Sequence, residues 1–216
     1  MRWVGLVAVA AAGLVLASCR FVPTSEVKSL TAAEQPDAGF DPDKMVASIW
    51  SSKVLPYFEK KAGPFAEVRD LAAASPDQAG AKFGYKPKSG EVPWTLMVRL
   101  DGVIVAADTE SRAATISVDA IGHGKADAIV QIGPAMRGTA IRDALDFVSF
   151  NNFTNQIDFA RYGKAFNLYV DREVLAKLPR DSLVGRKVSV IGAYTLGSPA
   201  EVPLVTPVKI NLGPKP

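Results

Sequence analysis

The first third of the chain carries a helical pattern of apolar residues. Between residues 41 and 84 they recur every three or four positions, a spacing that places them on one face of an α-helix. Asp41 supplies a helix N-cap, and the proline after it suits the first helical position. Pro56 is expected to end or kink this helix near Leu55, because proline lacks the N–H that a helix interior needs. Gly63-Pro64 marks a second break, so the pattern predicts several short helices.

From Trp94 onward the pattern changes to that of β-strands. Isoleucine and valine alternate with threonine and serine over residues 113–119, which is the two-residue period of a half-buried strand. The sequence predicts strands at 94–107, 113–119 and 128–132, a mostly helical stretch at 139–178, and strands at 188–194 and 208–212. Three strands, a helical insert and two strands follow one another as in the OB-fold, a partly open Greek-key barrel. Gly192, inside the fourth strand, is where such a barrel could bend sharply.

These patterns predict an α+β protein with an OB-like five-stranded antiparallel barrel, a helical insert after the third strand and a helical N-terminal region. The alternative is an open antiparallel sheet with helices packed on one face. In chain order we expect a signal peptide over residues 1–18, a flexible tether over 19–40, the helical region over 41–90 and the OB-like domain over 91–216.

The N-terminus has the layout of a bacterial lipoprotein signal peptide. Arg2 precedes an uncharged apolar run of 15 residues, 3–17, whereas a membrane span needs about 20. The run ends in Leu16-Ala17-Ser18-Cys19, which matches the lipobox: an aliphatic residue, two small residues and the cysteine that accepts the lipid. An uncleaved anchor helix with an incidental cysteine is the alternative. We expect Cys19 to be lipidated and the protein to be anchored on the periplasmic side of the envelope. Arg20, in place of aspartate, slightly favours the outer membrane over the inner.

Composition excludes several classes of function. The 25 Lys and Arg residues fall to 24 once Arg2 leaves with the signal peptide, against 22 Asp and Glu, so no strongly basic surface for nucleic acid is expected. Cys19 is the only cysteine and His123 the only histidine, which leaves too few ligands for a zinc site of the His/Cys type. The sequence contains no calcium loop of the EF-hand kind. We therefore expect neither a metal nor a cofactor.

No pattern pairs a nucleophile with a base. His123 lies between Gly122 and Gly124, which favours a surface loop, and nothing around it suggests a buried aspartate that would hold its ring as in a Ser-His-Asp triad. Gly133 and Gly138 are spaced as in a phosphate-binding P-loop, but the P-loop lysine is missing. We therefore reject nucleotide hydrolysis and expect a protein that is not an enzyme.

The densest set of polar groups able to recognise a ligand lies between residues 137 and 156. This segment joins the third strand to the helical insert, so we expect it at a mouth of the barrel. N–H groups at a helix start, with two arginines, could hold an anion, and amides beside Phe150 and Phe153 could hold a sugar. The alternative is structural: the threonine caps a helix, the arginine and aspartate form ion pairs, and the asparagines begin the next helix. The candidate ligand-binding residues are Arg137, Thr139, Arg142, Asp143, Asn155 and Gln156.

Six segments stand in an order that is typical of one protein family: the run from Asp108 to Arg112, Gln131-Ile132-Gly133-Pro134, the run from Arg137 to Ala144, Phe153-Thr154-Asn155-Gln156, Gly185-Arg186-Lys187-Val188 and Thr206-Pro207-Val208. From about Trp50 to Leu212 the chain resembles the predicted periplasmic lipoproteins designated domain of unknown function 2291. The family has no assigned activity, so the resemblance supplies no catalytic residues. Its members are often paired with sugar ABC-transporter components, which implies a role in carbohydrate uptake or sensing.

Two functions remain, and they belong to different classes. The first is a membrane-anchored, non-enzymatic binding or accessory protein linked to sugar uptake, whose partners are the membrane and either a saccharide or transporter components. The alternative is an envelope hydrolase that acts on saccharide. The absence of a recognisable nucleophile with a base favours the first.

Overall fold

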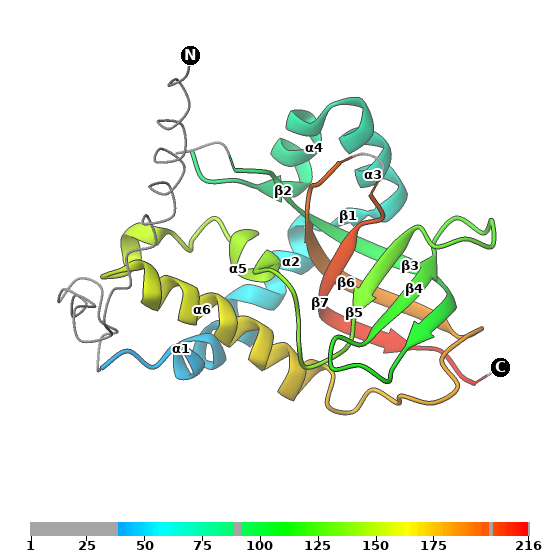
Figure 1. Cartoon of the computed structure of the whole chain (residues 1–216). Helices are drawn as coiled ribbons and strands as arrows, with labels where there is room; N and C mark the ends of the chain where they lie inside the picture. Colours follow the sequence, from blue (N-terminus) through cyan, green and yellow to red (C-terminus); the bar gives the residue numbers. More distant parts are fainter. Residues whose placement is uncertain (1–38, 89–91, 199–200, 216) are drawn as a thin grey trace, which may run out of the picture.

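Five strands close into a barrel: β3 (Thr95–Asp108), β4 (Thr115–Asp119), β5 (Ala128–Gln131), β6 (Lys187–Thr195) and β7 (Leu204–Leu212) (Figure 1). This computed structural model describes residues 39–88, 92–198 and 201–215, so the signal peptide, Cys19 and the expected tether up to residue 38 lie outside the described residues. The strands pair in the order β3-β4-β5-β7-β6, and β6 returns to β3. Four of these pairs are antiparallel, and β5 runs parallel to β7. The barrel is the OB-like one that the sequence predicts, and the alternative open sheet is not formed.

Two glycines permit close approaches between neighbouring strands. β3 continues through Gly102 without ending, and a β-carbon there would lie 2.3 Å from the Asp119 carbonyl oxygen of β4. In β6, a β-carbon on Gly192 would lie 2.5 Å from the Thr206 carbonyl oxygen of β7. The pairing of β6 with β7 shifts register between Ile191 and Gly192, so the irregularity expected there is present.

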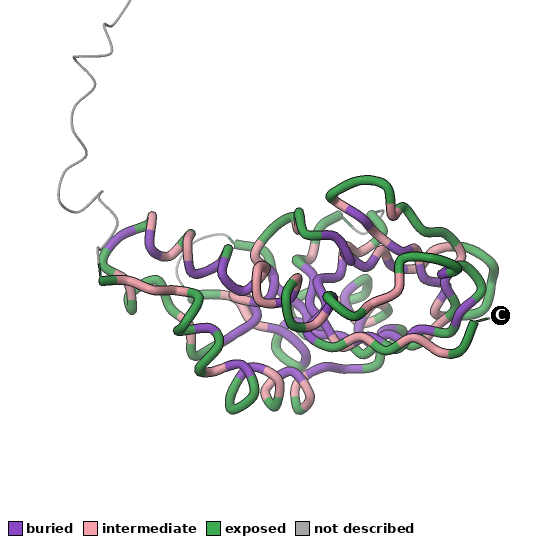
Figure 2. Tube along the Cα trace, turned by 90° about the horizontal axis from the view of Figure 1, so that it is seen from below, coloured by how far each residue is buried: buried purple, intermediate pink, exposed green. Residues whose placement is uncertain are grey.

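Alternating side chains of β6 fill the barrel interior. Val188, Val190 and Tyr194 are 3%, 1% and 3% exposed, while Lys187 faces solvent. The buried guanidinium of Arg186 donates hydrogen bonds of 3.0 and 2.6 Å to the Gly213 carbonyl and thereby ties the start of β6 to the chain after β7. Figure 2 shows how the buried segments run through the inside of the barrel and along the helices beside it.

The N-terminal region is helical, as predicted. Its elements are α1 (Pro42–Ile49), a π-helical turn (Trp50–Val54), α2 (Leu55–Lys61), β1 (Gly63–Pro64), α3 (Phe65–Ala74), α4 (Pro76–Phe83) and β2 (Gly84–Tyr85). Asp41 caps α1 by accepting the Lys44 N–H at 3.1 Å. Pro56 does not end the helix. A π-helical turn precedes it, and Pro56 lies in the first turn of α2, where the N–H that proline lacks is not needed for a hydrogen bond within the helix. α3 and α4 pack against β3.

The insert between β5 and β6 is more broken than the sequence predicts. It contains α5 (Ala140–Asp143), a 3₁₀ turn (Phe150–Asn152), α6 (Gln156–Tyr169) and a second π-helical turn (Val170–Val174). The mostly helical stretch expected from 139 to 178 is divided into short pieces because the Ser149 and Asn155 side chains accept backbone N–H groups and start new turns. No helix in the described ranges is both long and apolar enough to span a membrane.

α6 packs along α1, and one end of this helix pair receives the start of the described chain (Figure 1). Trp50 stacks on Tyr169 with ring centroids 4.4 Å apart. Phe40, which the sequence assigned to the tether, packs edge-on against Phe153 at 5.8 Å, and its carbonyl accepts a hydrogen bond from Arg161. Residue 40 therefore contacts the folded body.

Candidate functional site

Three of the predicted ligand-binding residues bond to one another. The Thr139 hydroxyl donates to Asp143 at 2.5 Å, and the Arg142 guanidinium donates to Asp143 at 2.8 and 2.6 Å. Arg142 also donates to the Thr139 hydroxyl at 3.1 Å and, on α6, to the Phe159 carbonyl at 3.0 Å. Its side chain is only 11% exposed and lies 3.8 Å from the centre of the Phe159 ring. These contacts fasten α5 to α6, and the Thr139 side chain does not cap α5.

The other three predicted residues are dispersed. Asn155 is buried and caps α6, accepting the Asp158 N–H at 2.8 Å and donating to the Asp158 carboxylate at 3.1 Å. Gln156 and Arg137 are exposed. The Arg137 backbone N–H and carbonyl are both bonded by the buried Gln131 side chain, at 2.7 and 3.1 Å. The structure thus divides the predicted set between a helix–helix contact, a helix cap and the surface.

The segment from residue 137 to 156 does not form an open mouth of the barrel. α5 packs against β6 and β7. Ile141 of α5 and Leu145, just after it, are fully buried in the core. Apolar side chains therefore fill the side of the barrel that α5 covers, where the sequence led us to expect ligand-binding polar groups.

The loop between β4 and β5 differs from what the sequence predicts about the surroundings of His123. The His123 ring lies on the surface as predicted, but its Nδ1 is 3.2 Å from the carboxylate of Asp119, whose side chain is 8% exposed. The same carboxylate accepts the N–H groups of Gly122 at 2.7 Å and Gly124 at 2.6 Å. Burial alone would raise the pKa of Asp119, but these N–H groups and the His123 ring more than offset it and hold the pKa below its ordinary value. A buried aspartate therefore does hold the ring.

Asp119, His123 and Asp127 bring possible metal-ligating atoms within 4.8 Å of one another. Asp127 accepts the Ala120 N–H at 2.8 Å and pairs with Arg69 at 3.1 Å. Because these carboxylate oxygens already accept backbone or guanidinium N–H groups, the geometry fits a loop held in shape by two aspartates better than a cation site.

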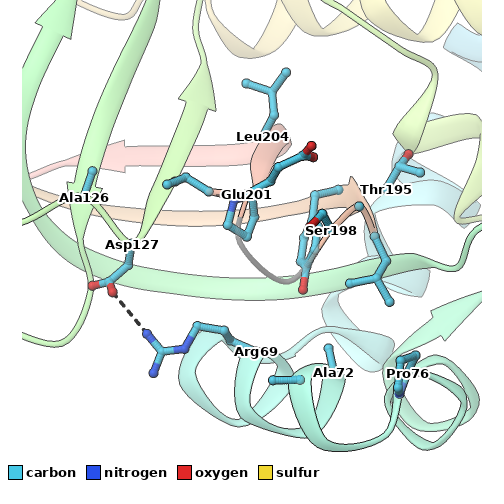
Figure 3. A pocket seen from close by; sticks show the side chains of 15 residues that line it. Arg69, Ala72, Pro76, Ala126, Asp127, Thr195, Ser198, Glu201 and Leu204 are labelled. Carbon is cyan, nitrogen blue, oxygen red and sulfur yellow. Dashed lines mark hydrogen bonds and ion pairs between the residues drawn. The ribbon is translucent and has the colours of Figure 1, made fainter.

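A cleft of about 400 Å³ lies between α3, the end of the β4–β5 loop and the β6–β7 loop (Figure 3). Figure 3 shows Arg69 on α3 paired with Asp127, while Ser198 and Glu201 line the cleft from the β6–β7 loop. The Glu201 N–H donates to the Ser198 carbonyl at 2.9 Å. The apolar part of the lining consists of Ala72, Ala73, Pro76, Leu196, Val202, Pro203 and Leu204. A volume of this size falls within the range of small-molecule sites.

Both donors and acceptors of hydrogen bonds line this cleft. Arg69 uses three of its five N–H donors on Asp70 and Asp127, which leaves two for a ligand. Tyr194, which is 3% exposed and packs in the barrel, borders the cleft, and burial raises the pKa of its phenol to about 12. None of the six residues predicted from the sequence lines this cleft.

Comparison with known families assigns the chain. The family model for "Predicted periplasmic lipoprotein (DUF2291)" matches residues 9–211. The chain belongs to this lipoprotein family. The resemblance found in the sequence is thereby confirmed, and with it the periplasmic side of the envelope as the location of the protein. No curated protein matches the lipoprotein.

The lipoprotein is also similar to a solved structure, an OB-fold protein from Thermotoga maritima. The two share 21% sequence identity with a TM-score of 0.63, over 81% of the lipoprotein and 99% of the Thermotoga chain. At this identity the likeness concerns the fold alone, and it agrees with the closed barrel described above.

Sequence reasoning missed the cleft because three distant segments build it. Arg69 and Ala72 lie on α3, Asp127 precedes β5, and Glu201 precedes β7. None of these segments has a recognisable motif, and only closure of the barrel brings them together. The one local signal is the glycine-rich loop before Asp127, whose position beside β5 places that carboxylate at the end of a strand.

Proposed function

We propose that this periplasmic lipoprotein is a non-enzymatic binding or accessory protein of sugar uptake, and that the cleft between α3 and the β6–β7 loop holds a small saccharide. The main support for this proposal is the lining of the cleft. Carboxylates, hydroxyls and a guanidinium with unused donors lie there beside an apolar wall. A sugar presents hydroxyl groups that both donate and accept, beside apolar C–H faces, and such a lining complements it. The pairing with sugar transporters that the family resemblance implies would fit the same class of ligand.

The arrangement of polar groups favours binding over catalysis. Both oxygens of Asp127 accept hydrogen bonds, one from Arg69 and the other from two backbone N–H groups, so Asp127 is poorly placed to exchange a proton. Among the described residues, the hydrogen bonds and ion pairs of the His123 ring are with the carboxylates of Asp119 and Asp127, and none is with a hydroxyl. A nucleophile activated by this histidine is therefore not part of the proposal.

An envelope hydrolase acting on saccharide is the second candidate. The observation that favours it is the presence of two carboxylates, Asp127 and Glu201, in one cleft, since most glycoside hydrolases work with a carboxyl pair. Under this alternative, Glu201→Gln would abolish release of reducing sugar while leaving sugar binding intact.

The test measures binding and turnover on the same mature lipoprotein, purified in detergent. A panel of mono- and disaccharides is titrated by calorimetry, and the same mixtures are assayed for reducing sugar. Ala73→Trp places a bulky side chain in the cleft, whereas Ala74→Trp, on the next exposed position of α3, lies outside the lining and is the matched control. We expect at least one sugar to bind, at least a tenfold loss of affinity with Ala73→Trp, no change with Ala74→Trp, and no turnover. Equal binding by both variants would place the sugar elsewhere.

Anchoring through Cys19 is part of the proposal. Cys19→Ala should leave an unprocessed precursor that takes up no labelled palmitate, because the cysteine thiol accepts the lipid before cleavage. Normal processing of this variant at the same position, with retention by lipid, would contradict the assignment of Cys19.

A further inference from the structure

The end of the molecule at which the described chain begins carries exposed apolar side chains. Phe150, in the 3₁₀ turn before α6, is 44% exposed, and Met45 on α1 is 41% exposed. Figure 1 places the start of α1 and the start of α6 at the end of the molecule opposite the C-terminus. We call Phe40, Phe150 and Phe153 the tether-end surface.

Ring contacts connect this surface to the point where the N-terminal segment joins the body. Phe150 packs edge-on against Phe159 at 5.5 Å, Phe159 packs against Phe153 at 5.2 Å, and Phe153 packs against Phe40 at 5.8 Å. The exposed ring of Phe150 therefore belongs to the same aromatic cluster that contacts residue 40. This surface therefore lies within reach of the structure in which the lipid-bearing N-terminus is anchored.

The charges at this end nearly balance. Lys44 pairs with Asp41 at 2.8 Å, and Arg161 pairs with the buried Asp158 at 3.1 Å. Asp43 pairs with Arg172 at 3.9 Å, and Lys164 is exposed beside them. Without a net basic patch, attraction to anionic lipid would contribute little here, and any attachment would depend on the apolar side chains.

We propose that the tether-end surface rests on the bilayer that carries the lipid anchor, with the rings of Phe150 and its neighbours at the depth of the lipid headgroups. Residues 20–38 can extend at most 3.3–3.6 Å each, so the anchor keeps the body within roughly 65 Å of the membrane. Such a link gives a second, weak contact an effective concentration of about millimolar, at which a small apolar surface suffices. Aromatic side chains are the ones that favour the membrane–water interface.

The membrane is the occupant that the position of the surface favours. A protein partner could meet any face of the body, whereas the lipid-bearing segment joins the body at this end. In this orientation α3, which lines the cleft, lies away from the membrane-facing end of the molecule (Figure 1). The inference depends on the lipid anchor and holds whether or not the cleft binds a sugar.

The single cysteine makes a depth measurement possible. Cys19 is consumed by lipid in the mature protein, so an introduced cysteine is the only reactive thiol. Asn151→Cys, next to Phe150, and Lys215→Cys, near the C-terminus, are each labelled with an environment-sensitive fluorophore. The full lipidated protein is then reconstituted in phosphatidylcholine vesicles that contain lipids with a quencher at the headgroup–acyl boundary.

We expect the probe at residue 151 to be quenched at least threefold more than the probe at residue 215. Adding Phe150→Ser should reduce the quenching at 151 to the reference level while far-UV circular dichroism still reports a cooperative melt, since Phe150 is exposed. Equal quenching at both positions would overturn the proposal, as would quenching at 151 that appears only with anionic lipid. The first of these results is also the one expected of a surface that binds a protein.

Discussion

Arg142→Ala tests whether the densest polar cluster of the sequence serves the fold. In the structure the guanidinium bridges α5 and α6 through Asp143, Thr139 and the Phe159 carbonyl, and only 11% of the side chain is exposed. Hydrogen bonds to charged groups contribute about 1.5–3 kcal/mol each. Asp143 is 33% exposed and keeps the Thr139 hydroxyl as a donor, so water replaces part of what is lost. We expect a total loss of about 2–3 kcal/mol in the free energy of unfolding.

The assay is urea unfolding of the mature protein in detergent, monitored by circular dichroism. If wild type and variant have the same m value, the shift in the urea midpoint reports the change in the free energy of unfolding. Arg142→Lys should recover less than half of the loss, because a lysine ammonium cannot reproduce the forked geometry of a guanidinium. A loss below about 0.5 kcal/mol, typical of a surface substitution, would refute the role assigned to Arg142.

Gly163 provides an independent check on the same contact. An alanine in a helix interior ordinarily stabilises by about 1 kcal/mol relative to glycine. At position 163 of α6, however, a β-carbon would lie 2.7 Å from Thr139 Cγ2 and 2.8 Å from Arg142 Nη1. Gly163→Ala should therefore destabilise wild type by about 1–3 kcal/mol, and by at least about 1 kcal/mol less in the Arg142→Ala background. Strictly additive effects would show that the two side chains do not compete for this space.

Three further predictions concern the barrel, the N-terminal junction and the β4–β5 loop. Val190→Asp buries an unpaired charge, which costs several kcal/mol, and should abolish soluble folded protein, whereas Lys187→Asp, at an exposed position of the same strand, should melt like wild type. A chain beginning at Asp41 should unfold about 1–2 kcal/mol more easily than one that retains Phe40, whose ring contacts are lost; identical urea midpoints would contradict this. Since folding lowers the pKa of Asp119, its contribution to stability is fully present above the ordinary pKa of 3.8 and is lost as the pH falls through the lower value of the folded state. The difference in unfolding free energy between wild type and Asp119→Asn should accordingly be constant at neutral pH and shrink below pH 3.8; a difference that persists at low pH would contradict this assignment.

The barrel could be predicted because its signals are local and repeated. Alternation over 113–119 defines one buried face of a strand, and the order of strands and insert then restricts the topology. The insert was predicted less well. Whether the side chains of Ser149 and Asn155 continue a helix or accept N–H groups and restart one depends on tertiary packing, which apolar spacing does not report.

The candidate site was harder to predict, because the same polar groups serve folding and recognition. A donor that recognises a ligand must be left without a full set of internal partners, and sequence gives residue types but not their partners. Arg142 and Asn155 are chemically suited to a sugar, yet each is bonded to its own fold. Arg69 belongs to a helical stretch without a motif, lines the cleft and has two N–H donors that these hydrogen bonds do not use. The local density of polar residues therefore identified side chains that hold helices of this protein together. The cleft could be recognised only once the structure showed which donors remain unused.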